Sequence, residues 1–179
     1  VIGAHYDHLG WGGEGSGSLD PDVHAIHNGA DDNGSGTAAI LELAEYFSKT
    51  VNKNRRGLIF TAFGGEEEGL LGSSSFVENS PVKLENIGAM LNLDMVGRME
   101  ENKLVVGGTS TSLLWNELLH KFNSDNLQLS FDEEGYGSSD HQSFYINNIP
   151  VLFFFTGAHK DYHRPSDDID KINYLGLKI

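Results

Sequence analysis

The sequence predicts an α/β protein in which helices cover both faces of a mostly parallel sheet. Strand-like and helix-like segments alternate along the chain, polar residues follow most of the apolar segments, and 150–155 is almost entirely apolar. Alternating strands and helices are typical of parallel sheets joined by crossover helices. An uninterrupted apolar run is typical of a strand that is covered on both faces. We therefore expect a three-layer α/β/α sandwich around a mixed, mostly parallel central sheet.

The expected strands are short apolar runs bounded by turn residues. They cover 1–6, 58–63, 87–93, 103–106, 127–131 and 150–155. Between the first strand and the first helix, Gly10–Ser18 contains five glycines and two serines. This composition predicts a loop, and the stretch is the only flexible-looking segment of the chain.

The expected helices follow from apolar residues at helical spacing. Ile40, Leu43 and Phe47 share one face in the first of them, and Leu114 and Phe122 share one in the third. Two shorter helices are expected from their position between strands. The four helices cover 34–49, 70–78, 112–123 and 140–146.

The length of 179 residues predicts a single domain that spans 1–179. The chain opens on an apolar strand at Val1 and stops inside an apolar pattern at Ile179. We therefore expect this domain to be truncated at both ends.

The composition argues against several classes of partner. The 12 Lys and Arg residues against 26 Asp and Glu residues give a net charge of −14. This balance opposes binding to nucleic acid or to an anionic membrane surface, because both require clustered basic side chains. The sequence contains no run of about 18 apolar residues, and it therefore predicts no helix inserted in a membrane. Cysteine is absent, so a metal ion would have to be held by histidine and carboxylate side chains.

Clusters of histidine and acidic residues follow several of the expected strands and fill the loop before the first helix. They lie at 5–7, 29–36, 66–68, 94 and 161–167. In open α/β sheets, ligands bind beyond the carboxyl ends of the strands. Carboxylates gathered at that edge would repel one another unless a divalent cation neutralised them. The pattern therefore predicts a metal site at this edge of the sheet.

Two ions fit this donor set better than one. Imidazoles with several carboxylates and no thiolate suit zinc or a similar borderline metal. Two ions about 3.5–4 Å apart need a carboxylate that bridges them. Asp32 lies in a glycine-rich loop where the backbone can approach closely, and it is the natural bridge.

Six stretches of the sequence, in this order, resemble the motifs of the co-catalytic di-zinc aminopeptidase family. That family includes bacterial secreted leucyl aminopeptidases, plasma glutamate carboxypeptidase and the glutaminyl cyclases. The resemblance covers nearly the whole chain and implies the zinc-exopeptidase (phosphorylase/hydrolase-like) fold. No single motif is specific, but all six in order are. They are Gly3–Asp7, Gly29–Gly36, Glu66–Ser73, Leu93–Asp94, Ser139–His141 and His163–Asp167.

The resemblance implies two Zn²⁺ ions per chain, with Co²⁺ or Mn²⁺ as substitutes. Asp32 would bridge the two ions. His5 and Asp94 would complete the ligands of one ion, and Glu67 and His163 would complete those of the other. His163 is preferred to the nearby His159, since Gly157 and Pro165 oppose the helix that would bring both histidines to one ion.

The resemblance also implies three residues that act in catalysis. Glu66 would be the general base, Asp7 would orient the imidazole of His5, and Tyr136 would donate a hydrogen bond to the developing oxyanion. A shift of one position in the acidic run 66–68 would exchange base and ligand, and the Gly-Leu-Leu-Gly-Ser that follows sets the register in the family.

Several other polar residues are expected to stay outside the ligand set. Single histidines are more often surface or hydrogen-bonding residues, and neighbours of ligands in acidic runs are more often structural or solvated. This group comprises His8, His24, His27, His120, Asp31, Glu68 and Asp168. Asp140 and His141 are expected to buttress the site without acting in the reaction.

The expected function is that of a zinc-dependent aminopeptidase acting on peptides with a free N-terminus. The family resemblance also implies export to the periplasm or the extracellular space. Three alternatives remain at this stage. One is a carboxypeptidase or dipeptidase of the same fold, another is a glutaminyl cyclase with one zinc, and the third is a binding relative without catalysis. The sequence does not indicate an oligomeric state.

Overall fold

A computed structural model of the protein describes residues 1–50 and 56–179. Within these residues, six strands form one sheet with the order β2-β1-β3-β6-β4-β5. The strands are β1 (Ile2–His5), β2 (Phe60–Phe63), β3 (Met90–Leu93), β4 (Lys103–Gly107), β5 (Gln128–Phe131) and β6 (Val151–Phe155). Among the described strand pairs, only β4 and β6 run antiparallel. The predicted mixed, mostly parallel sheet is therefore confirmed.

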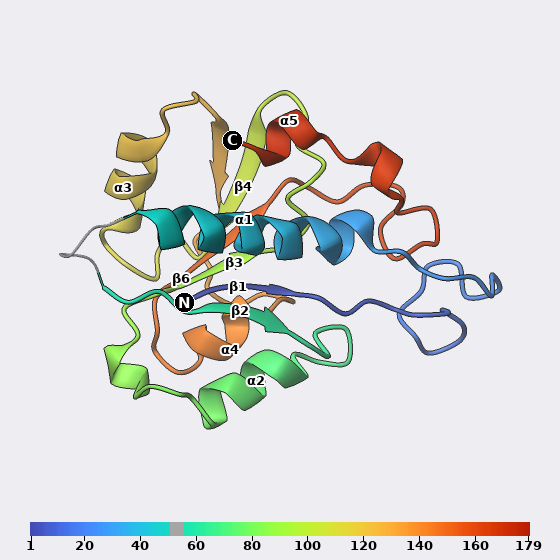
Figure 1. Cartoon of the computed structure of the whole chain (residues 1–179), viewed down its shortest axis with the longest axis horizontal. Helices are drawn as coiled ribbons and strands as arrows, with labels where there is room; N and C mark the ends of the chain where they lie inside the picture. Colours follow the sequence, from blue (N-terminus) through green and yellow to red (C-terminus); the bar gives the residue numbers. More distant parts are fainter. Residues whose placement is uncertain (51–55) are drawn as a thin grey trace.

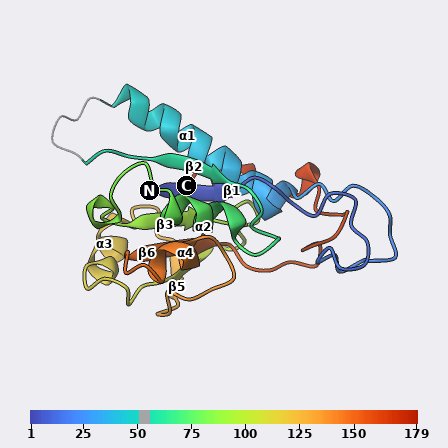
Figure 2. The ribbon, with the colours of Figure 1, turned by 90° about the horizontal axis from the view of Figure 1, so that it is seen from below.

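Helices cover both faces of this sheet (Figure 2), as the sequence predicted. Helix α1 packs on one face, and α2 and α4 pack together on the other. The helices are α1 (Gly36–Lys49), α2 (Leu71–Glu78), α3 (Trp115–Phe122), α4 (His141–Tyr145) and α5 (Tyr174–Leu177). The first four lie where apolar spacing or position predicted them; α1 and α2 start one or two residues later, and α3 and α4 are shorter at both ends. Helix α5 falls in the apolar stretch at the end of the chain, for which no helix was predicted.

Each face of the sheet has its own apolar core. On the side of α1, Ile40 packs against Ile2 and Ala4 of β1. On the opposite side, Phe144 of α4 packs with buried apolar residues of β2, β3 and β6. These two cores hold α1 and the α2–α4 pair in fixed positions relative to the strand ends.

Helix α3 covers its apolar face only in part, since Trp115, Leu118 and Leu119 are half-buried. Leu114 is 61% exposed and Phe122 is 69% exposed, and none of the α3 residues is buried. The apolar spacing predicted the helix correctly, although only part of that face is covered.

The parallel strands β1, β2, β3 and β6 end at one edge of the sheet. Long loops leave β1 and β6 at this edge and lie side by side in both views (Figures 1 and 2). A backbone hydrogen bond of 3.0 Å from Leu19 to His163 joins these loops. The turn Ala30–Ser35, which leads into α1, reaches the same edge. Within the described residues, no helix combines the length and the apolar character that crossing a membrane requires.

Candidate metal centre

The turn Ala30–Ser35 holds Asp32 in a buried position at the sheet edge. The backbone N–H groups of Asp31 and Asp32 donate to Oδ2 of Asp167, over 2.9 and 3.0 Å. The Asn33 side chain donates to the carbonyl of Leu93 at the end of β3, over 2.9 Å. Asp32 is only 3% exposed. Two loops and a strand end therefore fix the direction of its carboxylate.

The carboxylate of Asp32 lies between two imidazoles. Its Oδ1 atom is 3.3 Å from Nε2 of His5, and its Oδ2 atom is 3.3 Å from Nε2 of His163. His5 ends β1, whereas His163 lies in the loop after β6. Residues from distant parts of the chain thus share one carboxylate, with a separate oxygen for each imidazole.

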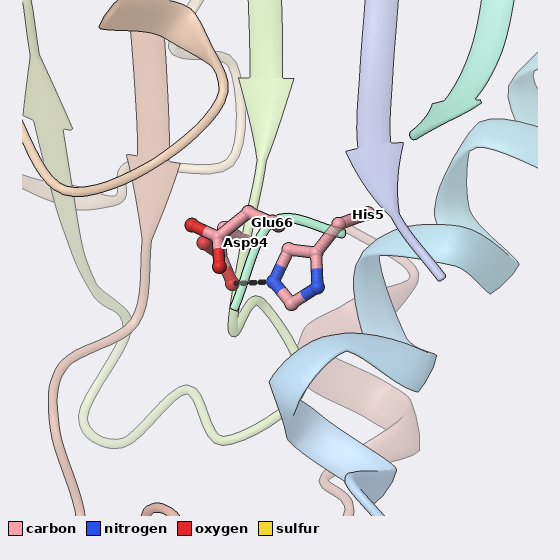
Figure 3. A group of neighbouring side chains, drawn as sticks. All are labelled: His5, Glu66 and Asp94. Carbon is pink, nitrogen blue, oxygen red and sulfur yellow. Dashed lines mark ion pairs between the residues drawn. The ribbon is translucent and has the colours of Figure 1, made fainter. Parts of the chain in front are cut away.

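The first group of donors surrounds His5 (Figure 3). Nε2 of His5 is 3.4 Å from Oδ1 of Asp94, the residue that follows β3. Glu66, from the turn after β2, points toward the same space. One potential ligand atom from each of the three residues lies within 4.8 Å of the others.

The second group surrounds Glu67. Oε2 of Glu67 is 3.1 Å from Nε2 of His163, and Oε1 is 2.7 Å from Nδ1 of His8. His8 was expected to stay outside the ligand set, and its contact here is with the carboxylate of Glu67. Its position just after β1 was the one signal in the sequence that could have found it.

Backbone carbonyls orient both imidazoles. Nδ1 of His5 is 3.1 Å from the carbonyl oxygen of Asp7, and Nδ1 of His163 is 3.0 Å from that of Gly17. A carbonyl can only accept, so each imidazole carries a proton on Nδ1, and Nε2 faces the carboxylates. Through the carbonyl of Gly17, the Gly10–Ser18 loop thus forms part of the site.

Asp7 contacts His5 through its backbone and lies near it with its carboxylate. Its carboxylate Oδ1 is 4.0 Å from Nδ1 of His5, whereas its own carbonyl makes the hydrogen bond to that imidazole. The Asp7 carboxylate instead accepts from the backbone N–H of Glu66, over 3.4 Å. Asp7 therefore contacts the turn that carries Glu66 and holds His5 through the backbone.

The crowded carboxylates of the site shift the pKa values of His5, His163 and Glu66. Burial opposes the protonation of His5, but its hydrogen bonds to Asp32 and Asp94 outweigh this and raise its pKa to about 12. Burial likewise opposes the protonation of His163, and Asp32 and Glu67 raise its pKa to about 10. Burial raises the pKa of Glu66 to about 8. The nearby His5 opposes this effect, and repulsion from the carboxylate of Asp94 adds to it.

The buried polar atoms fit a site for cations. Oδ2 of Asp32 and Oδ1 of Asp94 are buried and have no partner among the described residues that meets hydrogen-bond geometry, with an imidazole nitrogen nearby, at 3.3 and 3.4 Å. Buried carboxylate oxygens are costly unless they are paired or coordinate a metal. Imidazole nitrogens and carboxylate oxygens without thiolates are the donors that zinc accepts. The residues present therefore fit zinc at both groups.

Tyr136, expected at the site, and Tyr162 have different surroundings. Tyr136 is 61% exposed, and its ring packs edge-on against Tyr145 at 4.9 Å. Tyr162 stacks on His163 at 3.8 Å, and its pKa is raised by burial and by the carboxylates, Asp32 foremost among them. Sequence reasoning did not single out Tyr162, and its place beside His163 was the available signal.

Other histidines and acids expected outside the ligand set have separate partners. Nε2 of His159 is 3.1 Å from Oδ2 of Asp31, which is fully buried and away from solvent. Glu68 is exposed, and Asp168 accepts a hydrogen bond of 2.6 Å from Asn28. The structure thus places His163, and not His159, beside Asp32 and Glu67.

The chain folds into an α/β sandwich that gathers imidazoles and carboxylates beyond its strand ends, and this donor set fits zinc. Residues 1–178 match Peptidase family M28, and the chain belongs to that family.

Three relatives illustrate the similarity. Aminopeptidase YwaD of Bacillus subtilis is 36% identical over 159 residues, which cover 81% of this chain and 34% of the relative. The structure of BSAP, a zinc aminopeptidase from Bacillus subtilis, superposes with a TM-score of 0.76 and 30% identity, covering 99% of this chain and 42% of that one. The LapA aminopeptidase of Legionella pneumophila gives a TM-score of 0.75 and 28% identity, covering 99% and 46%. The chain spans less than half the length of these relatives.

Proposed function

We propose that this protein is a two-zinc aminopeptidase that hydrolyses the N-terminal peptide bond of peptides. The observation that carries the proposal is the position of Asp32, whose two oxygens each lie 3.3 Å from a different imidazole. A carboxylate that offers one oxygen to each of two donor groups is suited to bridging two ions. Family membership supports the same reaction class.

The chain has a complete set of donors for two ions. His5, Asp94 and Asp32 would hold one zinc, and Glu67, His163 and Asp32 would hold the other. When bound, zinc supplies a Lewis acid that polarises the peptide carbonyl and makes a water molecule easier to deprotonate.

Glu66 has the position and the protonation behaviour of a general base. It lies beside His5 and Asp94 without being needed as a ligand, and its pKa of about 8, raised by burial, lies close to neutral pH. A base whose pKa lies near the working pH transfers protons in both directions. Glu66 would accept a proton as water oxygen bonds to the carbonyl carbon. It would then deliver the proton to the amine nitrogen as the C–N bond breaks.

Charge favours the N-terminal end of a peptide over its C-terminal end. An enzyme that holds a terminal carboxylate needs a free cation near the site. Two arginines of the loops at this edge are already paired, Arg98 with Asp161 and Asp167, and Arg164 with Asp20. The carboxylates at the edge of the sheet, in contrast, would attract a protonated amino terminus.

The proposal is tested by zinc content and turnover measured on the same preparations. We expect two zinc ions per chain and chelator-sensitive hydrolysis of aminoacyl-p-nitroanilides, with no cleavage of their N-acetylated counterparts. Glu66→Gln should keep both ions and lower kcat by about 10²–10⁴-fold, since it removes the proton acceptor. Glu68→Gln is the matched control. The carboxylate of Glu68 is exposed, so its removal should change zinc content and kcat little.

Other outcomes would replace the proposal with a specific alternative. Release of C-terminal residues from peptides blocked at the N-terminus would indicate a carboxypeptidase. One ion per chain with cyclisation of N-terminal glutamine would indicate a cyclase. A protein that binds no zinc would be a binding relative.

A further inference from the structure

His8 lies against the second donor group, although no role was expected for it. Its side chain is 8% exposed, and Nδ1 is 2.7 Å from Oε1 of Glu67. Its ring packs edge-on against the ring of His163, with 5.7 Å between centroids. A buried imidazole thus touches both of the residues that are proposed to hold the second ion together with Asp32.

The fold makes room for this ring. A Cβ atom at Gly29 would lie 2.7 Å from Cγ and 2.8 Å from Cδ2 of His8, distances that real side chains do not tolerate. Gly29 also has a φ of 58°, a conformation that glycine adopts without strain. The glycine before the Asp32 turn therefore lets the His8 ring lie between that turn and Glu67.

The distances from His8 to Glu67 and Asp32 indicate whether His8 would bind the ion directly or support a ligand. Donors about 2.0 Å from one tetrahedral zinc lie about 3.3 Å from one another. Nε2 of His163 meets this condition, at 3.1 Å from Oε2 of Glu67 and 3.3 Å from Oδ2 of Asp32. Nδ1 of His8 does not, because it is 3.9 Å from Oδ2 of Asp32 and at hydrogen-bond distance from the other oxygen of Glu67.

We propose that His8 is a positioning residue for the second zinc ion. Its Nδ1–H donates to Oε1 of Glu67 and leaves Oε2 turned toward His163 and Asp32. Partners of this kind limit the rotation of a ligating carboxylate, and their loss lowers metal affinity by about 10–100-fold. The inference rests on the proposed function, since it assigns His8 to one of the two ions.

The test is a zinc titration of the protein by competition with a chromophoric chelator. In His8→Ala, we expect one of the two ions to bind about 10–100-fold more weakly and the other to keep its affinity. His8→Asn should recover most of the loss, because its amide nitrogen can take the place of Nδ1 as a donor. His120→Ala is the matched control, since His120 is exposed on α3.

Turnover supplies a second measurement. With saturating zinc, His8→Ala should regain a kcat close to that of the wild type, because His8 does not touch the reacting atoms. Three results would overturn the inference: two ions bound by His8→Ala with wild-type affinity, no recovery in His8→Asn, or a kcat that stays low at saturating zinc. Failure of the wild type to bind two ions would instead overturn the proposed function.

Discussion

At the scale of single residues, the site depends on which atom of each side chain faces the cluster. The two imidazoles each turn Nε2 toward carboxylates because a carbonyl accepts from Nδ1. For His163 the backbone contributes as well, since its φ of 52° lies in the left-handed region that few non-glycine residues occupy. Such conformations are costly and cluster at functional sites, where the surrounding contacts maintain them.

His141 is a buried titratable group behind the site, and its burial predicts a pH-dependent stability. Its side chain is 2% exposed, stacks on Phe153 at 4.7 Å and has no hydrogen-bond partner for Nδ1 within the described residues. Burial, opposed only weakly by the charge of Asp132, lowers its pKa to about 4. The unfolded chain therefore binds more protons than the folded protein between about pH 6.5 and pH 4, and acid destabilises the fold.

We expect this one group to lower the free energy of unfolding by about 1–2 kcal/mol between pH 7 and pH 5. His141→Gln should reduce the pH dependence by that amount, because glutamine cannot be protonated there. Urea unfolding of both proteins at the two pH values measures the difference, and other titrating groups cancel in the comparison. Equal pH dependence in the two proteins would show that His141 is not held neutral.

At the scale of elements, the beginning of α1 is pressed against the end of β3. A Cβ atom at Gly36 would lie 2.3 Å from the carbonyl oxygen of Leu93 and 2.4 Å from Oδ1 of Asn33. Gly36 also donates its backbone N–H to the Asn33 side chain, over 2.9 Å. The glycine thus allows the helix, the strand and the Asp32 turn to meet at one point.

Alanine usually stabilises a helix by about 1 kcal/mol relative to glycine. At Gly36 we expect the opposite sign, with Gly36→Ala destabilising the protein by about 1–3 kcal/mol, because the backbone carbonyl of Leu93 and the hydrogen-bonded side chain of Asn33 must both move. Zinc binding should weaken as well, since the turn that carries Asp32 shifts. Chemical denaturation and zinc titration provide the measurements. Gly57→Ala, where an added Cβ meets nothing within 4 Å, is the control and should be close to neutral.

At the scale of the whole molecule, a buried ionic network joins distant segments beneath the site. Arg98 pairs with Asp161 at 3.0 Å and with Asp167 at 2.6 Å. Asp167 is fully buried, and its other oxygen accepts from the backbone of Asp31 and Asp32. The network connects the loops after β3 and β6 to the turn before α1.

Removing the cation from this network should be costly. We expect Arg98→Met to lower the free energy of unfolding by about 3–5 kcal/mol, because the buried carboxylate of Asp167 loses its arginine partner and Asp161 is left paired with Lys171. Adding Asp167→Asn should recover part of that loss, giving a coupling of at least about 1 kcal/mol in a double-mutant cycle.

The control for this cycle is Lys103→Met, which removes an exposed cation paired with Glu101 and should cost less than about 1 kcal/mol. Strictly additive effects of the Arg98 and Asp167 substitutions would show that the network does not act as a unit.

The sequence by itself determined the fold class, the order of the elements and the segments that carry the donors. Strand and helix periodicity are local properties, and the carboxyl ends of parallel strands must meet at one edge of a sheet. His5, Glu66, Glu67 and Asp94 could therefore be placed together before any coordinates were known. The motif order carried the family resemblance, because six short patterns in sequence are specific where each alone is not.

Only the tertiary structure decided how the side chains pair. Four contacts depend on side-chain directions that the sequence does not show. They are the contact of His8 with Glu67, the stacking of Tyr162 on His163, the pairing of His159 with Asp31 and the backbone contact of Asp7 with His5. Those directions are set where loops from distant parts of the chain fold over one another, as in the contact of His8 with Glu67, 59 residues away. Local patterns hold no information on such contacts, because the same residue types satisfy the periodicity whichever way the side chains turn.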